Sequence, residues 1–250
     1  MENCDSNQND NHLCATRRLI LKSTLGAAAG VAGILSLATP EIVYAQALTK
    51  EQRDQMTPDQ IIDGLKAGNE RFRHNKLLRH DYLAQKNSTV KGQYPAAIIL
   101  SCIDSRAPAE ILFDTGIGEA YNSRVAGNIC NVDILGGLEY ACAVTGAKVI
   151  VVMGHTSCGA VKGAIDGVNL GNLTALLAKI KPAVQQTACS GERTAGNAAF
   201  VDAVAKTNVS LTVQQIRQES QILSDLEKSG KLKIVGSMYS LAGGEVTFFS

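Results

Sequence analysis

The sequence PAAIILSCIDSRAP at residues 95–108 joins a short apolar run to a cluster of reactive side chains. Residues 96–101, AAIILS, form a continuous apolar run of the kind found in strands that are buried on both faces. Cys102, Asp104 and Arg106 follow at once. A thiol, a carboxylate and a guanidinium at the end of a buried strand are unusual for a plain turn. They indicate a functional site at that end of the strand.

Similar apolar runs alternate with helical patterns along the rest of the chain. Further strands are predicted at about residues 120–125, 148–153, 233–238 and 245–249. Helical patterns fall at residues 107–113, 132–145, 158–166, 172–188 and in a long stretch within 197–229. This alternation predicts an α/β fold with a mostly parallel β-sheet covered by helices on both faces. It leaves the order of the strands open.

A helical arm precedes this α/β domain. Thr57, Pro58 and Asp59 fit an N-cap, a proline at the first helical position and an acidic first turn. Apolar residues then recur at helical spacing, which predicts a helix over about residues 57–75. The polar stretch 74–93 that follows is expected to be an extended surface connection. We therefore expect an arm at residues 48–93 and the α/β domain, with the functional site, at 94–250.

The first 47 residues have the order of an export signal. A polar start leads through the adjacent Arg17 and Arg18 into a small apolar stretch at residues 23–38. The arginine pair resembles the twin-arginine type of signal, and the apolar stretch is short for a transmembrane helix of about 20 residues. Small residues permit cleavage after residue 45 or 47; the alternative is an uncleaved anchor. We expect a bacterial protein that is periplasmic or otherwise exported.

Composition and charge exclude several classes of partner. The chain has 45% apolar and 19% charged residues, which is ordinary for a globular protein. Its net charge is +1, and the basic residues form no stripe with interleaved aromatics. We therefore expect no nucleic-acid partner, and no stable membrane insertion once the signal is removed.

A second predicted strand ends in another group of reactive residues. The strand at 148–153 leads into GHTSCGA at 154–160, so that His155 and Cys158 follow it. Because ligands collect beyond the carboxyl ends of parallel strands, these residues are expected to meet Cys102 in one crevice. Two thiolates and an imidazole are a zinc ligand set, and three protein ligands leave a fourth position open, as in catalytic zinc sites.

Asp104 and Arg106 fit a supporting role beside such a zinc ion. Bound zinc lowers the pKa of its water to about 7 and so gives a hydroxide nucleophile. A carboxylate that accepts the hydroxide's hydrogen would orient it, and a guanidinium would keep that carboxylate ionised. By themselves the two residues could equally form a capped turn with a surface ion pair. The zinc ligands beside them favour the catalytic interpretation.

The other cysteines are expected to be structural. Seven cysteines occur in the sequence, of which five follow residue 47. An odd number fits a framework of disulfides poorly, although export leads to an oxidising compartment. Cys130, Cys142 and Cys189 lie in patterns that do not lead to the predicted zinc site.

Both motifs together resemble those of the β-class carbonic anhydrases. The likeness covers CIDSR at 102–106 and GHTSCG at 154–159, and it extends through SRVAGN at 123–128, LEYA at 138–141 and the C-terminal strands. The resemblance implies reversible hydration of carbon dioxide to bicarbonate and a proton. It also implies about four parallel strands plus one added strand, and a homodimer or a multiple of dimers that uses the N-terminal helix.

Carried over by position, the resemblance makes Cys102, His155 and Cys158 the ligands of one Zn²⁺ per subunit. It makes Asp104 and Arg106 the orienting pair. In some members the carboxylate at the position of Asp104 binds zinc as a fourth ligand at lower pH and closes the site. The sequence leaves the open and closed states as alternatives and favours the open one.

This sequence departs from the family's pattern at two places. Members that close the site often have a second bicarbonate pocket made by a Trp, an Arg and a Tyr. Arg124 and Tyr140 match the last two, but Ile99 stands at the Trp position. Many relatives also carry a substrate-contacting Gln where this chain has Thr115. The substrate contacts near Thr115 are therefore left open.

Two other functions are compatible with the same residues. Related folds with this zinc site hydrolyse carbonyl sulfide or carbon disulfide, and the shape of the pocket would decide between these substrates and carbon dioxide. A non-catalytic protein stabilised by zinc is the other alternative. It would have no need of the Asp104–Arg106 pair. A thiol redox function would require a Cys-x-x-Cys pair, and the sequence contains none.

Overall fold

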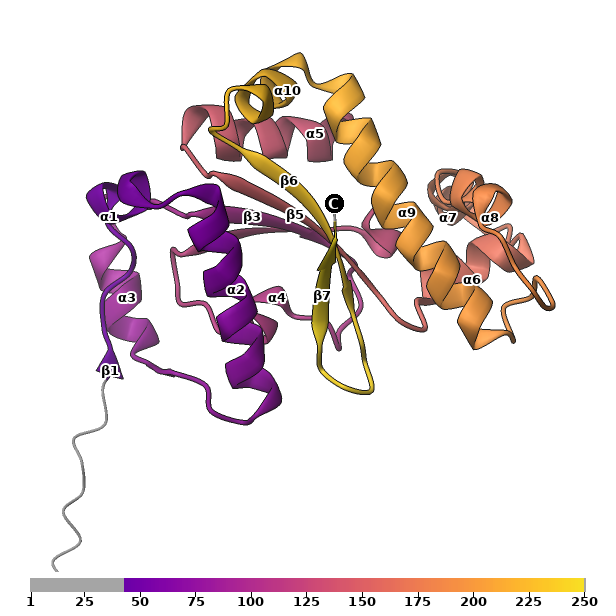
Figure 1. Ribbon diagram of the computed structural model, residues 1–250, viewed down its shortest axis with the longest axis horizontal. Helices are drawn as coiled ribbons and strands as arrows, with labels where there is room; N and C mark the ends of the chain where they lie inside the picture. The colour runs from indigo at the N-terminus through magenta and orange to yellow at the C-terminus, as the bar shows by residue number, and fades with distance from the viewer. Residues whose placement is uncertain (1–42, 250) are drawn as a thin grey trace, which may run out of the picture. The chain divides into compact units, whose positions relative to one another are not determined.

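A computed structural model describes residues 43–249 and has a five-stranded β-sheet at its centre (Figure 1). The strands are β3 (Ala97–Ser101), β4 (Ala120–Arg124), β5 (Val149–His155), β6 (Lys233–Tyr239) and β7 (Val246–Phe249). They are arranged in the order β4-β3-β5-β6-β7. The first four are parallel and β7 runs antiparallel to β6. This arrangement confirms the predicted α/β class and the added fifth strand.

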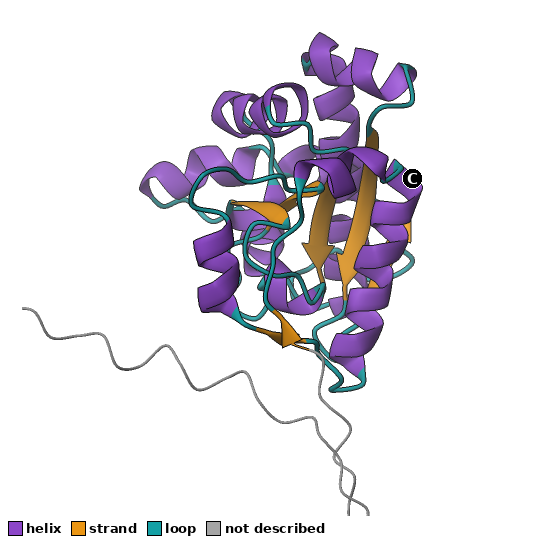
Figure 2. Ribbon diagram, turned by 90° about the vertical axis from the view of Figure 1, so that its left-hand side faces the viewer, coloured by secondary structure: helices purple, strands orange, loops and turns teal. Residues whose placement is uncertain are grey.

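Helices cover both faces of this sheet (Figure 2). Those that follow β3 in the chain are α4 (Ala109–Leu112), α5 (Val132–Glu139), α6 (Gly159–Asp166), α7 (Gly171–Ala178), α8 (Lys181–Gln186), α9 (Ala198–Glu219) and α10 (Gln221–Lys228). A short 3₁₀ turn, η1 (Ala126–Asn128), follows β4, and a π-helical turn, η2 (Tyr140–Val144), extends α5. Within the described part of the chain, none of the helices has the length and apolar character needed to cross a membrane.

Alternate side chains of the central strands enter two separate cores. Ile98 and Leu100 of β3 pack with α5, α9 and α10 on one face. Ile99 of the same strand, with Val151 of β5, packs with α2 (Pro58–Arg73) and α4 on the other. Every residue of β3 and β5 is buried. This two-sided burial is why both strands are continuous apolar runs in the sequence.

The predicted helices differ from the structure in how they are divided. The pattern at residues 172–188 is two helices, α7 and α8, because Pro182 in the first turn of α8 has no N–H with which to continue a preceding helix. The long stretch at 197–229 is likewise broken at Ser220, which ends α9 and caps α10. Apolar periodicity alone does not show either break.

The segment before the main sheet is more structured than expected. The short helix α1 (Lys50–Gln55) was not expected, whereas the longer α2 confirms the helix predicted over about residues 57–75; each begins with a threonine capping box, at Thr49 and Thr57. The prediction of an extended connection at residues 74–93 was wrong. β2 (Arg79–His80) pairs in parallel with β1 (Val43–Tyr44), and Asp81 then caps α3 (Tyr82–Ser88).

The predicted export signal spans residues 1–47, and residues 1–42 of it lie outside the described residues. Leu48, where the mature chain is expected to begin, packs against the core shared by α2 and β3. The division of the chain into an arm at 48–93 and a domain at 94–250 stays a prediction.

Two glycines of α2 provide a matched test of the packing between α2 and α4. A Cβ added at Gly68 would lie 1.9 Å from the carbonyl oxygen of Phe113, whereas one added at Gly64 would meet nothing within 4 Å. Gly68→Ala should therefore lower the free energy of unfolding by about 1–3 kcal/mol through overpacking. Gly64→Ala should raise it by up to about 1 kcal/mol, because alanine is the better helix former.

Chemical denaturation of the two variants beside the unchanged protein measures both effects. Equal stabilities for the Gly68 and Gly64 variants would contradict the close contact between α2 and the end of α4.

Candidate metal centre and catalytic site

Two neighbouring strands bring the predicted metal ligands to one edge of the sheet. Ser101, the last residue of β3, pairs with Met153 of β5. Cys102 follows β3 directly, and β5 continues for two more residues to His155. Cys158 is the N-cap residue of α6, which starts just after β5. The parallel register thus joins residues that are more than fifty positions apart in the sequence.

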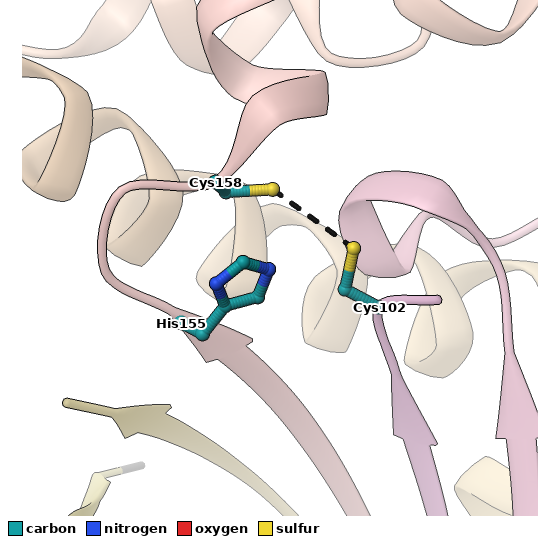
Figure 3. Close-up of side chains that lie close together, drawn as sticks. All are labelled: Cys102, His155 and Cys158. Atoms are coloured by element: carbon teal, nitrogen blue, oxygen red, sulfur yellow. Dashed lines mark hydrogen bonds between the residues drawn. The ribbon is translucent and has the colours of Figure 1, made fainter. Parts of the chain in front are cut away.

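The three side chains form one compact and buried group (Figure 3). The Sγ atoms of Cys102 and Cys158 are 4.0 Å apart, and both sulfurs and a ring nitrogen of His155 lie within 4.8 Å of one another. The exposed fractions of the three residues are 4%, 1% and 1% in chain order. Among the described residues this is the one group of its kind that could hold a metal ion.

The hydrogen bonds of His155 fit a metal ligand. Nδ1 lies 2.9 Å from the carbonyl oxygen of Thr156, and a carbonyl can only accept, so Nδ1 carries the proton. Nε2 is then the nitrogen with a free lone pair. It is buried and has no hydrogen-bond partner among the described residues. A buried lone pair between two sulfurs is the arrangement that a zinc ligand set requires.

The two thiols differ in acidity because they are so close. A hydrogen bond from the Cys158 thiol is the main cause that lowers the pKa of Cys102 despite burial. The Cys102 thiolate and burial together raise the pKa of Cys158. The backbone N–H of Gly127 also donates to the Cys102 sulfur, at 3.3 Å. The Cys158 thiol can therefore lose its proton beside the Cys102 thiolate only if a cation balances the second negative charge. A bound metal ion would provide that cation.

Asp104 and Arg106 form a two-pronged ion pair beside this group. Asp104 accepts hydrogen bonds from Nε of Arg106 at 3.0 Å and from Nη2 at 2.8 Å. The pair holds the pKa of Asp104 well below its usual range, against the opposing effect of partial burial. Asp104 Oδ2 also lies 3.8 Å from Nε2 of His155. An ionised carboxylate thus lies beside the metal ligands at neutral pH.

A further arginine, Arg124, holds the backbone of the same turn. Its Nε donates to the carbonyl oxygen of Cys102 at 2.9 Å, and its Nη2 donates to that of Asp104 at 2.5 Å. The sequence suggested Arg124 only as part of a second bicarbonate pocket. The sequence did not predict these two hydrogen bonds. Both go to backbone carbonyl groups, which every residue has, so no particular residue type marks them.

The other residues singled out in the sequence lie apart from the ligand group. Ile99 is a residue of β3, and its side chain is buried in the core that this strand shares with α2 and α4. Tyr140 lies on η2, with about half of its surface exposed. The hydroxyl of Thr115 donates to the carbonyl oxygen of Glu110. No described hydrogen bond joins Thr115 to the ligands, and its part in substrate binding stays open.

The remaining cysteines of the described segment are free thiols away from the metal ligands. Burial, and then the charge of Glu219, raise the pKa of Cys130 to about 11. Burial alone raises the pKa of Cys142 to about 12. The thiols of Cys130 and Cys142 therefore stay protonated at neutral pH and are poor metal ligands, as expected for structural cysteines.

An apolar cavity of about 360 Å³ adjoins the site. Cys102, Ile103 and Asp104 form one wall, and its other lining residues are Ala126, Gly159, Ala160, Gly163, Val168, Leu173 and Leu177. Cys102 and Asp104 are the two ionisable residues of the lining, and the others are apolar or glycine. A small uncharged molecule could therefore occupy it next to the metal ligands.

Known proteins are similar to this chain in sequence and in fold. Residues 97–246 match the family model described as carbonic anhydrase. Carbonic anhydrase 2 of Mycobacterium tuberculosis is 36% identical over 72% of this chain and 87% of its own length. The carbonic anhydrase of Mycolicibacterium smegmatis is also 36% identical, over 73% of this chain and 88% of its own length.

Solved structures support the fold. A tetrameric β-carbonic anhydrase of Sordaria macrospora is similar over 64% of this chain and 82% of its own, with a TM-score of 0.57 and 23% identity. The β-carbonic anhydrase CafA of Aspergillus fumigatus is similar over 77% and 89%, with a TM-score of 0.59 and 21% identity. With the family match and the Cys-His-Cys site, these findings show that the chain belongs to the β-class carbonic anhydrases.

Proposed function

We propose that the chain is a zinc-dependent carbonic anhydrase that interconverts carbon dioxide and bicarbonate at the Cys102–His155–Cys158 centre. The observation that carries this proposal is the unpartnered Nε2 of His155, buried between two thiols and 3.8 Å from an ionised carboxylate. Cys102, His155 and Cys158 would hold the zinc ion, which would lower the pKa of a bound water to about 7 and so supply a hydroxide at neutral pH.

The surrounding residues support this chemistry. The carboxylate of Asp104 accepts hydrogen bonds and is kept ionised by Arg106, so it would orient a hydrogen-bond donor placed among the ligands. The apolar cavity beside Cys102 suits carbon dioxide, which is small and carries no net charge. The side chain of Arg106 is 59% exposed and places a positive charge beside Asp104, where it would attract the bicarbonate anion.

Stopped-flow hydration of carbon dioxide by the mature protein, with zinc measured in the same sample, tests the proposal. We expect turnover together with one zinc per chain. Stoichiometric zinc without hydration at pH 7–9 would overturn it, and hydrolysis of carbonyl sulfide or carbon disulfide in that sample would identify the alternative substrate.

Asp104→Ala should remove most of the activity and leave zinc bound. The expected loss is about 10²-fold or more in kcat/KM, as for other groups that position a reacting atom. Asp225→Ala, which removes an exposed carboxylate on α10, is the matched control and should keep full activity. An Asp104→Ala variant as active as the control would show that this carboxylate has no catalytic part.

Cys158→Ala should abolish stoichiometric zinc binding, because two protein ligands hold zinc much more weakly than three. Cys142→Ala removes an equally buried thiol from the core beneath η2 and should retain one zinc per chain. Zinc analysis of the two purified variants decides the matter. Equal zinc content in both would contradict the ligand assignment.

We further infer a homodimer or a multiple of dimers. The relative from Sordaria macrospora is described as tetrameric, and the described chain exposes the apolar side chains of Tyr82, Leu83 and Val90 on and next to α3. Association that covers these side chains would remove them from water.

We also propose that residues 1–47 direct export through the twin-arginine route and are then removed. The support is the order of Arg17, Arg18 and the short apolar stretch in the sequence. Replacing both arginines by lysine in the full chain should leave an uncleaved precursor in the cytoplasm of an expressing bacterium. Cell fractionation and N-terminal sequencing measure this, with Lys22→Arg as the control. Unchanged export of the double variant would contradict the route.

A further inference from the structure

Helix α9 carries polar side chains on a face that is otherwise apolar. Its apolar residues pack against the ligand-bearing turns at one end and against the sheet at the other. Asn208 and Thr212 are nevertheless 3% and 4% exposed. Asp202 lies six residues nearer the start of the helix than Asn208, which is almost two turns, and is partly buried. Buried polar groups are unfavourable unless they are hydrogen-bonded, so the partners of these residues indicate their role.

Asn208 is bonded to the turn that contacts Cys102. Its Nδ2 donates to the carbonyl oxygen of Gly127 at 2.8 Å, and the hydroxyl of Thr212 donates to that of Asn128 at 3.4 Å. Gly127 in turn donates its N–H to the sulfur of Cys102. A single residue of the turn is thus held by α9 at its carbonyl group while its N–H contacts the thiolate.

The conformation and surroundings of Gly127 both favour glycine at this position. Its φ is +69°, which favours glycine, and a Cβ at this position would lie 2.5 Å from Cδ1 of Ile180. Without the bond from Asn208 the carbonyl of Gly127 would lose a buried partner. The direction of its N–H toward Cys102 would then depend on packing alone.

Asp202 is bonded to the other ligand-bearing turn. Its Oδ1 accepts the backbone N–H of Ser157 at 2.8 Å, and Ser157 lies between the ligands His155 and Cys158. Ser157 has a φ of +55°, which is uncommon for a residue other than glycine, so this turn depends on outside bonds to keep its shape.

We propose that Asn208 and Asp202 are positioning residues for the metal centre, and that α9 holds the Cys102 side and the His155–Cys158 side at a fixed separation. This inference rests on the proposed zinc site and deepens it. Neither residue touches a ligand atom. They act through Gly127 and Ser157, as outer partners of metal ligands do when they orient the donor atoms.

Asn208→Ala in the mature protein tests the first bond. Zinc affinity, measured by competition with a chromogenic chelator, should fall about 10-fold, the lower end of the loss typical for a direct outer partner of a ligand, because Asn208 acts through Gly127. In the cobalt-substituted protein, the thiolate-to-cobalt charge-transfer bands should shift, because the Cys102 thiolate loses its oriented N–H donor.

Asn69→Ala is the matched control. Asn69 is 2% exposed and donates to the carbonyl groups of Leu112 and Gly244, away from the ligand-bearing turns. This variant should lose stability but keep the zinc affinity and cobalt spectrum of the unchanged protein. Equal effects in both variants, or no effect of Asn208→Ala, would overturn the proposal.

Asp202 provides a second test that does not depend on a buried substitution. Asp202→Ala should weaken zinc binding, and Asp202→Asn should restore it, because the amide oxygen can still accept from Ser157. Equal affinities in the two variants would overturn the role of Asp202. If the unchanged protein itself bound no zinc, the proposed function would fail together with this inference. Tight binding that these variants leave intact would overturn the inference alone.

Discussion

The parallel register between β3 and β5 is the constraint on which the rest of the site depends. Because Ser101 lies opposite Met153, the residues after both strands emerge at the same edge of the sheet. A shift by one residue would turn Cys102 toward the opposite face and separate it from His155 and Cys158. The two apolar cores on either side of β3 oppose such a shift, since it would also exchange Ile98 and Leu100 with Ile99. The packing that stabilises the fold therefore also fixes the metal ligands.

Charge explains why the residues around the ligands are arranged as they are. The buried site collects a thiolate, a second thiol and a carboxylate. Such a concentration of acidic groups is unfavourable unless cations compensate it, and Arg106 compensates only Asp104. A divalent ion would balance the two sulfurs. The same deficit of positive charge would favour a bound metal ion, and it explains the separate guanidinium beside the carboxylate.

Much of the fold and the ligand set could be predicted from the sequence, because both leave strong local patterns. The strands β3 and β5 are continuous apolar runs, and Cys102, His155 and Cys158 follow them directly. The π-helical turn η2 and the pairing of β1 with β2 leave no comparable pattern. The bond between Asn208 and Gly127 joins a side chain to a carbonyl 81 residues away, so it depends on the packing of α9 over the η1 turn and leaves no local pattern in the sequence.

In the proposed centre, residues from two separate turns hold one zinc ion through two sulfurs and one nitrogen. X-ray absorption at the zinc edge of the mature protein measures this most directly. The account predicts two sulfur scatterers at about 2.3 Å and two nitrogen or oxygen scatterers at about 2.0–2.2 Å. The fourth position belongs to water in an open site or to Asp104 in a closed one. Three or four sulfur scatterers, or none, would contradict the account.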